Sequence, residues 1–345
     1  MSRLDPIWTA GRLNEALAKA EGDIHLDLGP GGKIDTFDDD FKGFAPRTRE
    51  FQREMNRRHP GRVLVQPIAG SEEFDEGLRR LPPLLALLSI NPEPWCRTEI
   101  SPGALDSVGL FFDYTNPLWE WLVRAARAGK AHIFPFREAG FDIGSGRENP
   151  PVDKSAIPLP GLVHGGQKGP PAWLRAQLED FELARIAPKV QSHADAIAVA
   201  AGVMEMHDVG ESHELAQSIE GQGQHRAGDY WHAIHHRREP DTSNAKYWFR
   251  KVGSHRIHES LATASRSFLS VAVISDRASD TDKAIERLTP NGVWDSFAFV
   301  DFCNQSTAEK DSRLIWIARQ LQFLEMTLLL DSAYEDATTD AGSRS

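Results

Sequence analysis

The spacing of hydrophobic and polar positions changes about halfway along the chain. In the first half, short apolar runs alternate with amphipathic stretches, which predicts strands over 24–28, 62–68, 108–112 and 131–136 with helices between them. Strands that alternate with helices are typical of βαβ units and of a mostly parallel sheet. Residues 1–143 are therefore expected to form an α/β domain.

In the second half, apolar residues recur every three or four positions, which is the helical period. Residues 172–334 are therefore expected to form an all-α domain. The stretch 144–171 between the halves is rich in glycine and proline and is predicted to be a linker or a wrapping loop. The polar tail 335–345 is expected to be disordered. The predicted helices of the second half span 172–186, 194–206, 211–220, 228–239, 243–252, 258–269, 294–305 and 307–334.

Composition narrows the classes of partner. The chain carries 39 Lys and Arg against 50 Asp and Glu, a net charge of −11, which argues against nucleic acid and anionic membranes because both repel an acidic protein. We find no apolar run near the roughly 20 residues that span a bilayer, and no leader-like start. With two cysteines in all, a cytoplasmic location is expected.

Histidines gather in one part of the second half. Nine of the 13 lie between residues 193 and 258. On a helix over 228–239, His232, His235 and Glu239 share one face, and His236 lies close to His232. Pro240 is expected to end this helix because proline cannot continue the hydrogen-bond pattern, while Asp241 is predicted to cap the next one. The pattern predicts a tight helical hairpin.

The hairpin carries a recognisable string. From His235 to Arg250, with its blocks HRREPD and SNAKYWFR, it resembles the core of an uncharacterised family of bacterial and fungal proteins, over residues 207–332. Its second helix, Asn244 to Arg250, is also similar to the second helix of a Sel1-like repeat. Neither resemblance implies a known activity, cofactor or set of site residues.

A metal centre is the first interpretation of the histidines. Imidazole and carboxylate are ligands for divalent transition metals, and ligands one helical turn apart can share an ion. We expect His213, His232, His236 and Glu239 to hold such an ion, with His235 an alternative to His236. The other interpretation, which stays open, is that these histidines are hydrogen-bonded core residues. Further candidates for the third or fourth ligand are His207, Glu214 and Glu259.

The same segment is locally basic. Between residues 226 and 258, seven Lys and Arg oppose three Asp and Glu, which leaves +4 before any histidine charge. Arginine binds phosphate or carboxylate in a fork, and histidine can transfer protons. This predicts a small phosphorylated or carboxylated substrate, although pairing of the arginines with the chain's own acids would also account for them. The residues expected to act in catalysis are His232, His235, His236, Glu239, Arg237 and Arg250.

One other site, and one other function for the hairpin, stay open. Asp27 and Asp113 each end or follow a predicted strand, and in a parallel sheet both would lie at the edge where ligands bind.

The hairpin is alternatively a scaffold without catalysis, which binds a protein partner through a basic aromatic groove. That hypothesis predicts an exposed Arg237 and Arg250 and histidines that point apart, whereas the enzyme hypothesis predicts histidines that converge.

Overall fold

The chain divides into two compact units. One comprises Met1–Asp75 and Pro82–Pro158, and the other comprises Glu76–Leu81 and Leu159–Ser345. The domain borders expected from the sequence, after residues 143, 171 and 334, stay predictions. The computed structural model describes residues 9–19, 23–27, 33–37, 61–67, 81–92, 96–133, 159–165, 169–187, 189–271 and 278–339.

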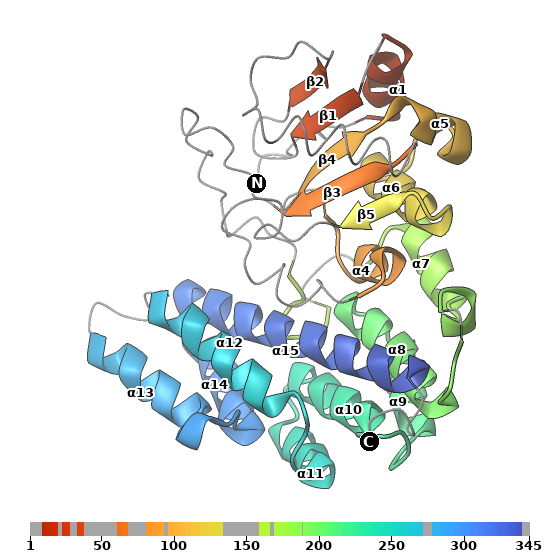
Figure 1. The fold of residues 1–345 in the computed structure, drawn as a ribbon. Helices are drawn as coiled ribbons and strands as arrows, with labels where there is room; N and C mark the ends of the chain where they lie inside the picture. Colours follow the sequence, from red (N-terminus) through yellow and green to blue (C-terminus); the bar gives the residue numbers. More distant parts are fainter. Residues whose placement is uncertain are drawn as a thin grey trace. The chain divides into compact units, whose positions relative to one another are not determined.

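The first unit contains a five-stranded sheet with the order β2-β1-β4-β3-β5 (Figure 1). The pairs β1–β2, β1–β4 and β3–β4 are antiparallel, and β3–β5 is parallel. The strands span Asp23–Asp27 (β1), Lys33–Phe37 (β2), Val63–Pro67 (β3), Cys96–Ile100 (β4) and Ala131–Ile133 (β5).

The prediction of a mostly parallel sheet is wrong. Among the described strands one pairing of four is parallel, and most of the described residues are helical. Residues 28–32, which join β1 to β2, are too few for the crossover of a dozen or more residues that parallel neighbours need. Residues 108–112 form the end of a helix and a loop instead of a strand. Residues 38–60 and 68–80, which include stretches between the predicted strands where helices are expected, lie outside the described residues.

The helices of the first unit build its core beside the sheet. Helices α4 and α6 pack on each other and on β5, and they bury Leu85, Leu88 and Trp121. The indole of Trp121 donates a hydrogen bond to the carbonyl oxygen of Gly109 at 2.8 Å. The described helices span Ala10–Lys19 (α1), Pro83–Ser89 (α4), Pro102–Val108 (α5) and Pro117–Arg127 (α6).

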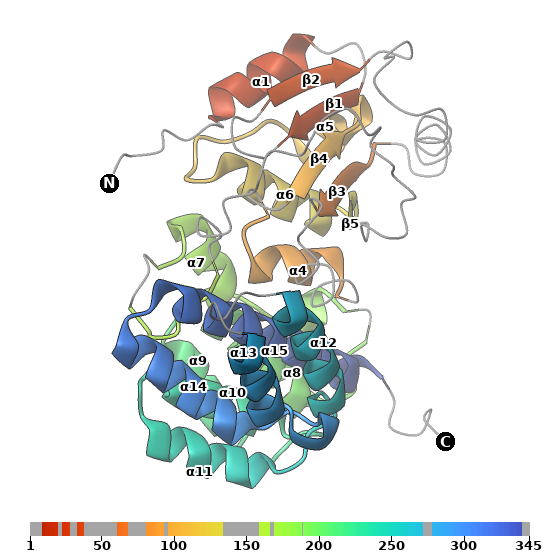
Figure 2. The ribbon, with the colours of Figure 1, turned by 90° about the vertical axis from the view of Figure 1, so that its left-hand side faces the viewer.

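The described elements of the second unit are all helices. The long helix α15 lies beside α8 and α12 and also contacts α14 and α10 (Figures 1 and 2). It continues to Thr338, into the segment expected to be a disordered tail. The helices span Ala172–Glu179 (α7), His193–Met206 (α8), Glu211–Ser218 (α9), Ala227–Arg238 (α10), Thr242–Val252 (α11), His258–Val271 (α12), Ala278–Leu288 (α13), Ser296–Glu309 (α14) and Ser312–Thr338 (α15), with short 3₁₀ turns at Leu183–Arg185 and Pro290–Gly292.

Helix α10 is surrounded by other helices, and all of its residues are buried. Its close approach to α8 depends on Gly202, because a Cβ atom there would lie 2.5 Å from the ring of Trp231. This approach brings Glu205, one turn further along α8, against the polar residues of α10. Polar groups in such an environment need partners, since an unpaired buried polar group is costly.

Candidate metal centre

The hairpin of α10 and α11 forms as the sequence predicts. Helix α10 ends at Arg238, and the carboxylate of Asp241 accepts a hydrogen bond from the backbone N–H of Asn244 at 3.0 Å, so the predicted cap is confirmed. The packing of the two helices places Trp248 over His232, with the ring centroids 3.9 Å apart and nearly parallel. The hairpin thus fixes the orientation of one imidazole.

Three imidazoles converge beside this hairpin. His232 and His236 lie one turn apart on α10, and His213 faces them from α9. The Nε2 atoms of His213 and His232 are 2.9 Å apart, and the centroids of the His213 and His236 rings are 5.2 Å apart. One ligand atom from each of the three lies within 4.8 Å of the other two, which is close enough for a single ion. We call these residues the triple-histidine group.

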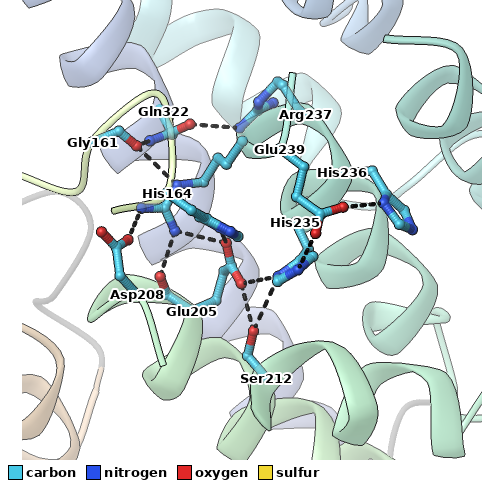
Figure 3. A network of polar contacts seen from close by, with 11 residues as sticks. Gly161, His164, Glu205, Asp208, Ser212, His235, His236, Arg237, Glu239 and Gln322 are labelled. Carbon is cyan, nitrogen blue, oxygen red and sulfur yellow. Dashed lines mark hydrogen bonds and ion pairs between the residues drawn. The ribbon is translucent and has the colours of Figure 1, made fainter. Parts of the chain in front are cut away.

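A second polar group surrounds Glu205 (Figure 3). His235 Nδ1 donates to Glu205 Oε2 at 2.8 Å, and His164 Nε2 donates to Oε1 at 2.7 Å. The hydroxyl of Ser212 also donates to Oε2, at 2.5 Å. His164, Glu205 and His235 also bring three ligand atoms within 4.8 Å of one another. We call His164, Glu205 and His235 the Glu205 group.

Glu205 is also paired with a buried arginine. Arg238 Nη1 donates to Glu205 Oε1 at 2.7 Å and to its backbone oxygen at 2.6 Å, while Nη2 contacts Asp208. The side chains of both Glu205 and Arg238 are buried. Burial raises the pKa of Glu205, but the charge of Arg238 and the hydrogen bonds from His164 and His235 outweigh it and hold the pKa well below its usual value. Glu205 is therefore ionised.

Glu239 connects the two groups. Its Oε2 accepts from His236 Nδ1 at 2.8 Å, and its Oε1 lies 3.4 Å from His235 Nε2, so the carboxylate sits between the two rings (Figure 3). The side chain is 45% exposed. Its partial burial raises the pKa of Glu239, but the hydrogen bond from His236 and the nearby imidazoles lower it by more. The site thus has an ionised carboxylate on its solvent side.

The pKa values of His213 and His232 shift in the opposite direction to that of His235. Burial, helped by the neighbouring histidines, lowers the pKa of His232 to about 3, and the same causes lower the pKa of His213. These two rings are therefore neutral near pH 7, and a neutral imidazole keeps one nitrogen lone pair that can bind a metal. In the Glu205 group, burial lowers the pKa of His235, but Glu205 raises it by more, and the net shift is upward.

The predicted ligands and the predicted arginines have different surroundings. His213, His232 and His236 come together with Glu239 beside them, and His235 joins the adjacent Glu205 group. The two arginines named with them point elsewhere. Arg237 is buried, its Nη2 lies 2.6 Å from Glu325 Oε2, and its guanidinium lies 4.6 Å from the Phe299 ring centroid. Arg250 is exposed, with its guanidinium 5.5 Å from the Phe297 ring centroid.

Other candidates fall outside both groups. Among the described residues, neither set of three ligand atoms includes His207, Glu214 or Glu259, and the two glutamates are exposed. Asp113 follows a loop and not a strand, so the sheet-edge site loses one of its two carboxylates.

Sequence reasoning missed Glu205 and His164. Glu205 stands near the end of an alanine-rich apolar helix, where an acidic residue among apolar neighbours is the signal of a buried role. His164 lies in the glycine- and proline-rich stretch that the pattern treats as a linker.

A further set of histidines lies apart from both groups. His225 Nδ1 donates to Asp336 Oδ2 at 2.6 Å, and the ring of His255 lies 6.1 Å from the rings of both His225 and His258. The Nε2 atoms of His255 and His258 are buried and have no hydrogen-bond partner in the described part of the chain. We call His225, His255 and His258 the dispersed histidines.

The chain matches no protein-family model, no curated protein and no solved structure. None of the described helices is both long enough and apolar enough to cross a membrane.

Proposed function

We propose that the protein is a metal-dependent enzyme in which His213, His232 and His236, together with Glu239, hold one divalent transition metal ion. The observation that carries the proposal is the 2.9 Å approach of the Nε2 atoms of His213 and His232, with a third imidazole within reach of the same ion. Imidazole and carboxylate together suit zinc, iron or manganese.

The triple-histidine group suits an ion better than the Glu205 group because of charge. Arg238 already donates to Glu205. A dication at roughly 5 Å from the guanidinium would meet about 7 kcal/mol of repulsion at an effective dielectric of about 20, which offsets its attraction to Glu205. The charged side chain bonded to the triple-histidine group is the carboxylate of Glu239, which attracts a cation.

The ligand atoms need small movements to bind. Ligands of tetrahedral zinc lie about 3.3 Å apart, given bonds of roughly 2.0–2.1 Å. His236 Nδ1 and Glu239 Oε2 are 2.8 Å apart, so the ion would replace the proton between them. His236 Nε2 lies 3.1 Å from the side-chain amide of Asn244, and a half-turn of that amide makes its oxygen the acceptor of the Nε2 proton.

The proposed chemistry is Lewis-acid activation of a substrate or of water, which a bound ion provides at neutral pH. Glu239 is 45% exposed, so a small molecule can reach the ion beside it. Arg237 and Arg238 are held in buried ion pairs, so the ion itself would supply the positive charge that binds a carboxylate or phosphate group. The proposed substrate is therefore a small anion that coordinates the ion directly as a fifth ligand, beside the three imidazoles and Glu239.

Helix α11 supports a second candidate, a scaffold that binds a protein partner. Tyr247 is 49% exposed, Arg250 is exposed on the same helix, and Lys251 Nζ lies 5.6 Å from the Tyr247 ring centroid. Arg237, the other residue of the expected groove, is buried. Capture of a partner that is lost in Arg250→Ala with no change in metal content would favour this candidate.

The test of the metal proposal is the metal content of the purified protein, measured by mass spectrometry after growth with zinc, iron and manganese. We expect close to one ion per chain, and loss of that ion in His213→Ala and His232→Ala. The matched control is His193→Ala, because His193 is an exposed histidine at the start of α8. A wild-type protein without metal, or variants that keep a full complement, would contradict the proposal.

A further inference from the structure

We infer that a relay of polar contacts positions the carboxylate of Glu239 on the metal ion: hydrogen bonds join Arg238 to Glu205 and Glu205 to His235, and an ion-pair contact joins His235 to Glu239. His235 is thus a positioning residue for the fourth ligand and not a ligand itself. The inference rests on the proposed function, because it concerns how that same ion is held.

Both ring nitrogens of His235 face carboxylates. Nδ1 donates to Glu205 Oε2 at 2.8 Å, and Nε2 lies 3.4 Å from Glu239 Oε1. Because each nitrogen faces an acceptor, the ring has no nitrogen left for an ion in this arrangement. Its geometry is that of a connector between a buried carboxylate and a half-exposed one.

The buried end of the relay is fixed. Glu205 accepts hydrogen bonds from Arg238, His164, Ser212 and His235, and its side chain is 1% exposed. Arg238 is held in turn by the backbone oxygen of Gly161, to which its Nε donates at 2.9 Å. A carboxylate with four donors cannot change rotamer without breaking several bonds, so it is a rigid anchor.

The outer end is mobile without the relay. Glu239 follows the last residue of α10 and is 45% exposed, so its free side chain would sample several rotamers. His235 holds Oε1, which leaves Oε2 directed at His236 and hence at the proposed ion. The ring of His164 packs edge-on against His235, with centroids 4.4 Å apart, and limits the tilt of that ring.

The test is a double-mutant cycle on Co²⁺ affinity, followed by the visible absorption of bound Co²⁺ with a competing chelator. Partners that orient metal ligands typically contribute 10–100-fold in affinity. We expect His235→Leu to weaken Co²⁺ binding by about 10–100-fold, and Glu239→Gln to weaken it comparably. Adding His235→Leu to Glu239→Gln should weaken it no further, because His235 acts through Glu239.

The control is His255→Leu, the same substitution at a buried histidine of the dispersed set, which should leave the affinity and the Co²⁺ spectrum unchanged. The spectrum separates positioning from general damage, since His235→Leu should reproduce the band shift of Glu239→Gln. The unfolding midpoint without metal shows whether each variant is folded. Glu205→Gln serves as a second variant and should give the same band shift.

The outcomes separate the two claims. Wild-type protein that binds no ion overturns the proposed function and the inference with it. One ion per chain with unchanged affinity in His235→Leu, or fully additive effects in the cycle, overturns the relay and leaves the proposed function standing. Two ions per chain, one of which is lost in His164→Ala, would make the Glu205 group a second metal site and also overturn the relay.

Discussion

The triple-histidine group and the dispersed histidines lie in the same helical unit, yet their rings face different surroundings. In the first, the Nε2 atoms of His213 and His232 approach to 2.9 Å, and His236 bonds to a carboxylate. In the second, the rings of His255 and His258 are 6.1 Å apart, and their Nε2 atoms are buried without a partner in the described structure. Histidine density alone therefore does not make a ligand site.

Spacing and carboxylates account for the difference. His232 and His236 are four residues apart on one helix, so their rings lie on one face, where α9 adds a third. His255 precedes α12 and His258 begins it, so these two do not share a helical face. Substitutions in the triple-histidine group are therefore expected to change metal binding. Substitutions among the dispersed histidines are expected to change only the stability of the fold.

The largest expected effect on the free energy of unfolding is at the buried ion pair between Arg238 and Glu205. Arg238→Met removes the cation paired with buried Glu205 and should lower the free energy of unfolding by about 3–5 kcal/mol. The reason is that an ionised carboxylate stays buried without its main counter-charge. Urea unfolding measures the change, and a loss below about 1 kcal/mol would mean that the pair contributes no more than a surface ion pair.

The second effect is stabilisation by Zn²⁺, which should depend on the triple-histidine group and not on the dispersed histidines. Zn²⁺ at about 100 times its dissociation constant should raise the free energy of unfolding by about 2.7 kcal/mol, since the ion binds only the folded chain. The rise should appear in the wild type and in His255→Leu and should be absent in His213→Ala. Unfolding with and without Zn²⁺ gives the measurement, and equal rises in all three proteins would place the ion elsewhere.

The third effect concerns pH and the dispersed histidines. Burial, together with His258, His225 and Arg256, lowers the pKa of His255 from 6.5 to about 3. His255 therefore binds a proton less readily in the folded state than in the unfolded chain. The contribution of neutral His255 to the free energy of unfolding is complete above pH 6.5 and is lost as the pH falls toward 3.

The slope from this one group is at most about 1.4 kcal/mol per pH unit. Replacing His255 with Leu should flatten the stability curve over that window by up to this slope. The ring of Tyr230 also packs on His255, but it carries no charge in this range. An unchanged curve in metal-free protein would show that His255 is not held neutral.

The smallest effects are expected at the surface. Arg250→Ala and His193→Ala each change an exposed side chain and should alter the free energy of unfolding by no more than about 0.5 kcal/mol. Neither should alter the metal content. A large loss in Arg250→Ala would point to a structural role for its contact with Phe297.

The sequence predicts the hairpin because its signals are local. Pro240 and Asp241 end one helix and start the next, and the spacing of His232 and His236 places both rings on one face. Such signals lie within a few residues of the structure that they determine. His213 required one further step, namely that the preceding helix packs against the hairpin.

The features that were predicted wrongly or missed depend on contacts between residues far apart in the sequence. Counting charges between 226 and 258 treats Arg237 and Arg238 as free cations, but their partners are Glu325 and Glu205 on other helices. The pattern of the first half fixes neither strand direction nor pairing, so an antiparallel sheet with helical connections resembles a parallel one. Glu205 is recognisable only once α8 and α10 are packed together.

The central claim is that one ion lies among His213, His232 and His236. Anomalous X-ray scattering from crystals grown with Zn²⁺ tests it most directly, because it locates the metal without reference to activity. The account predicts one peak about 2.0–2.1 Å from a nitrogen of each ring, with a carboxylate oxygen of Glu239 as the fourth ligand. A fully occupied peak elsewhere, or imidazoles that keep their direct contacts in saturating Zn²⁺, would contradict it.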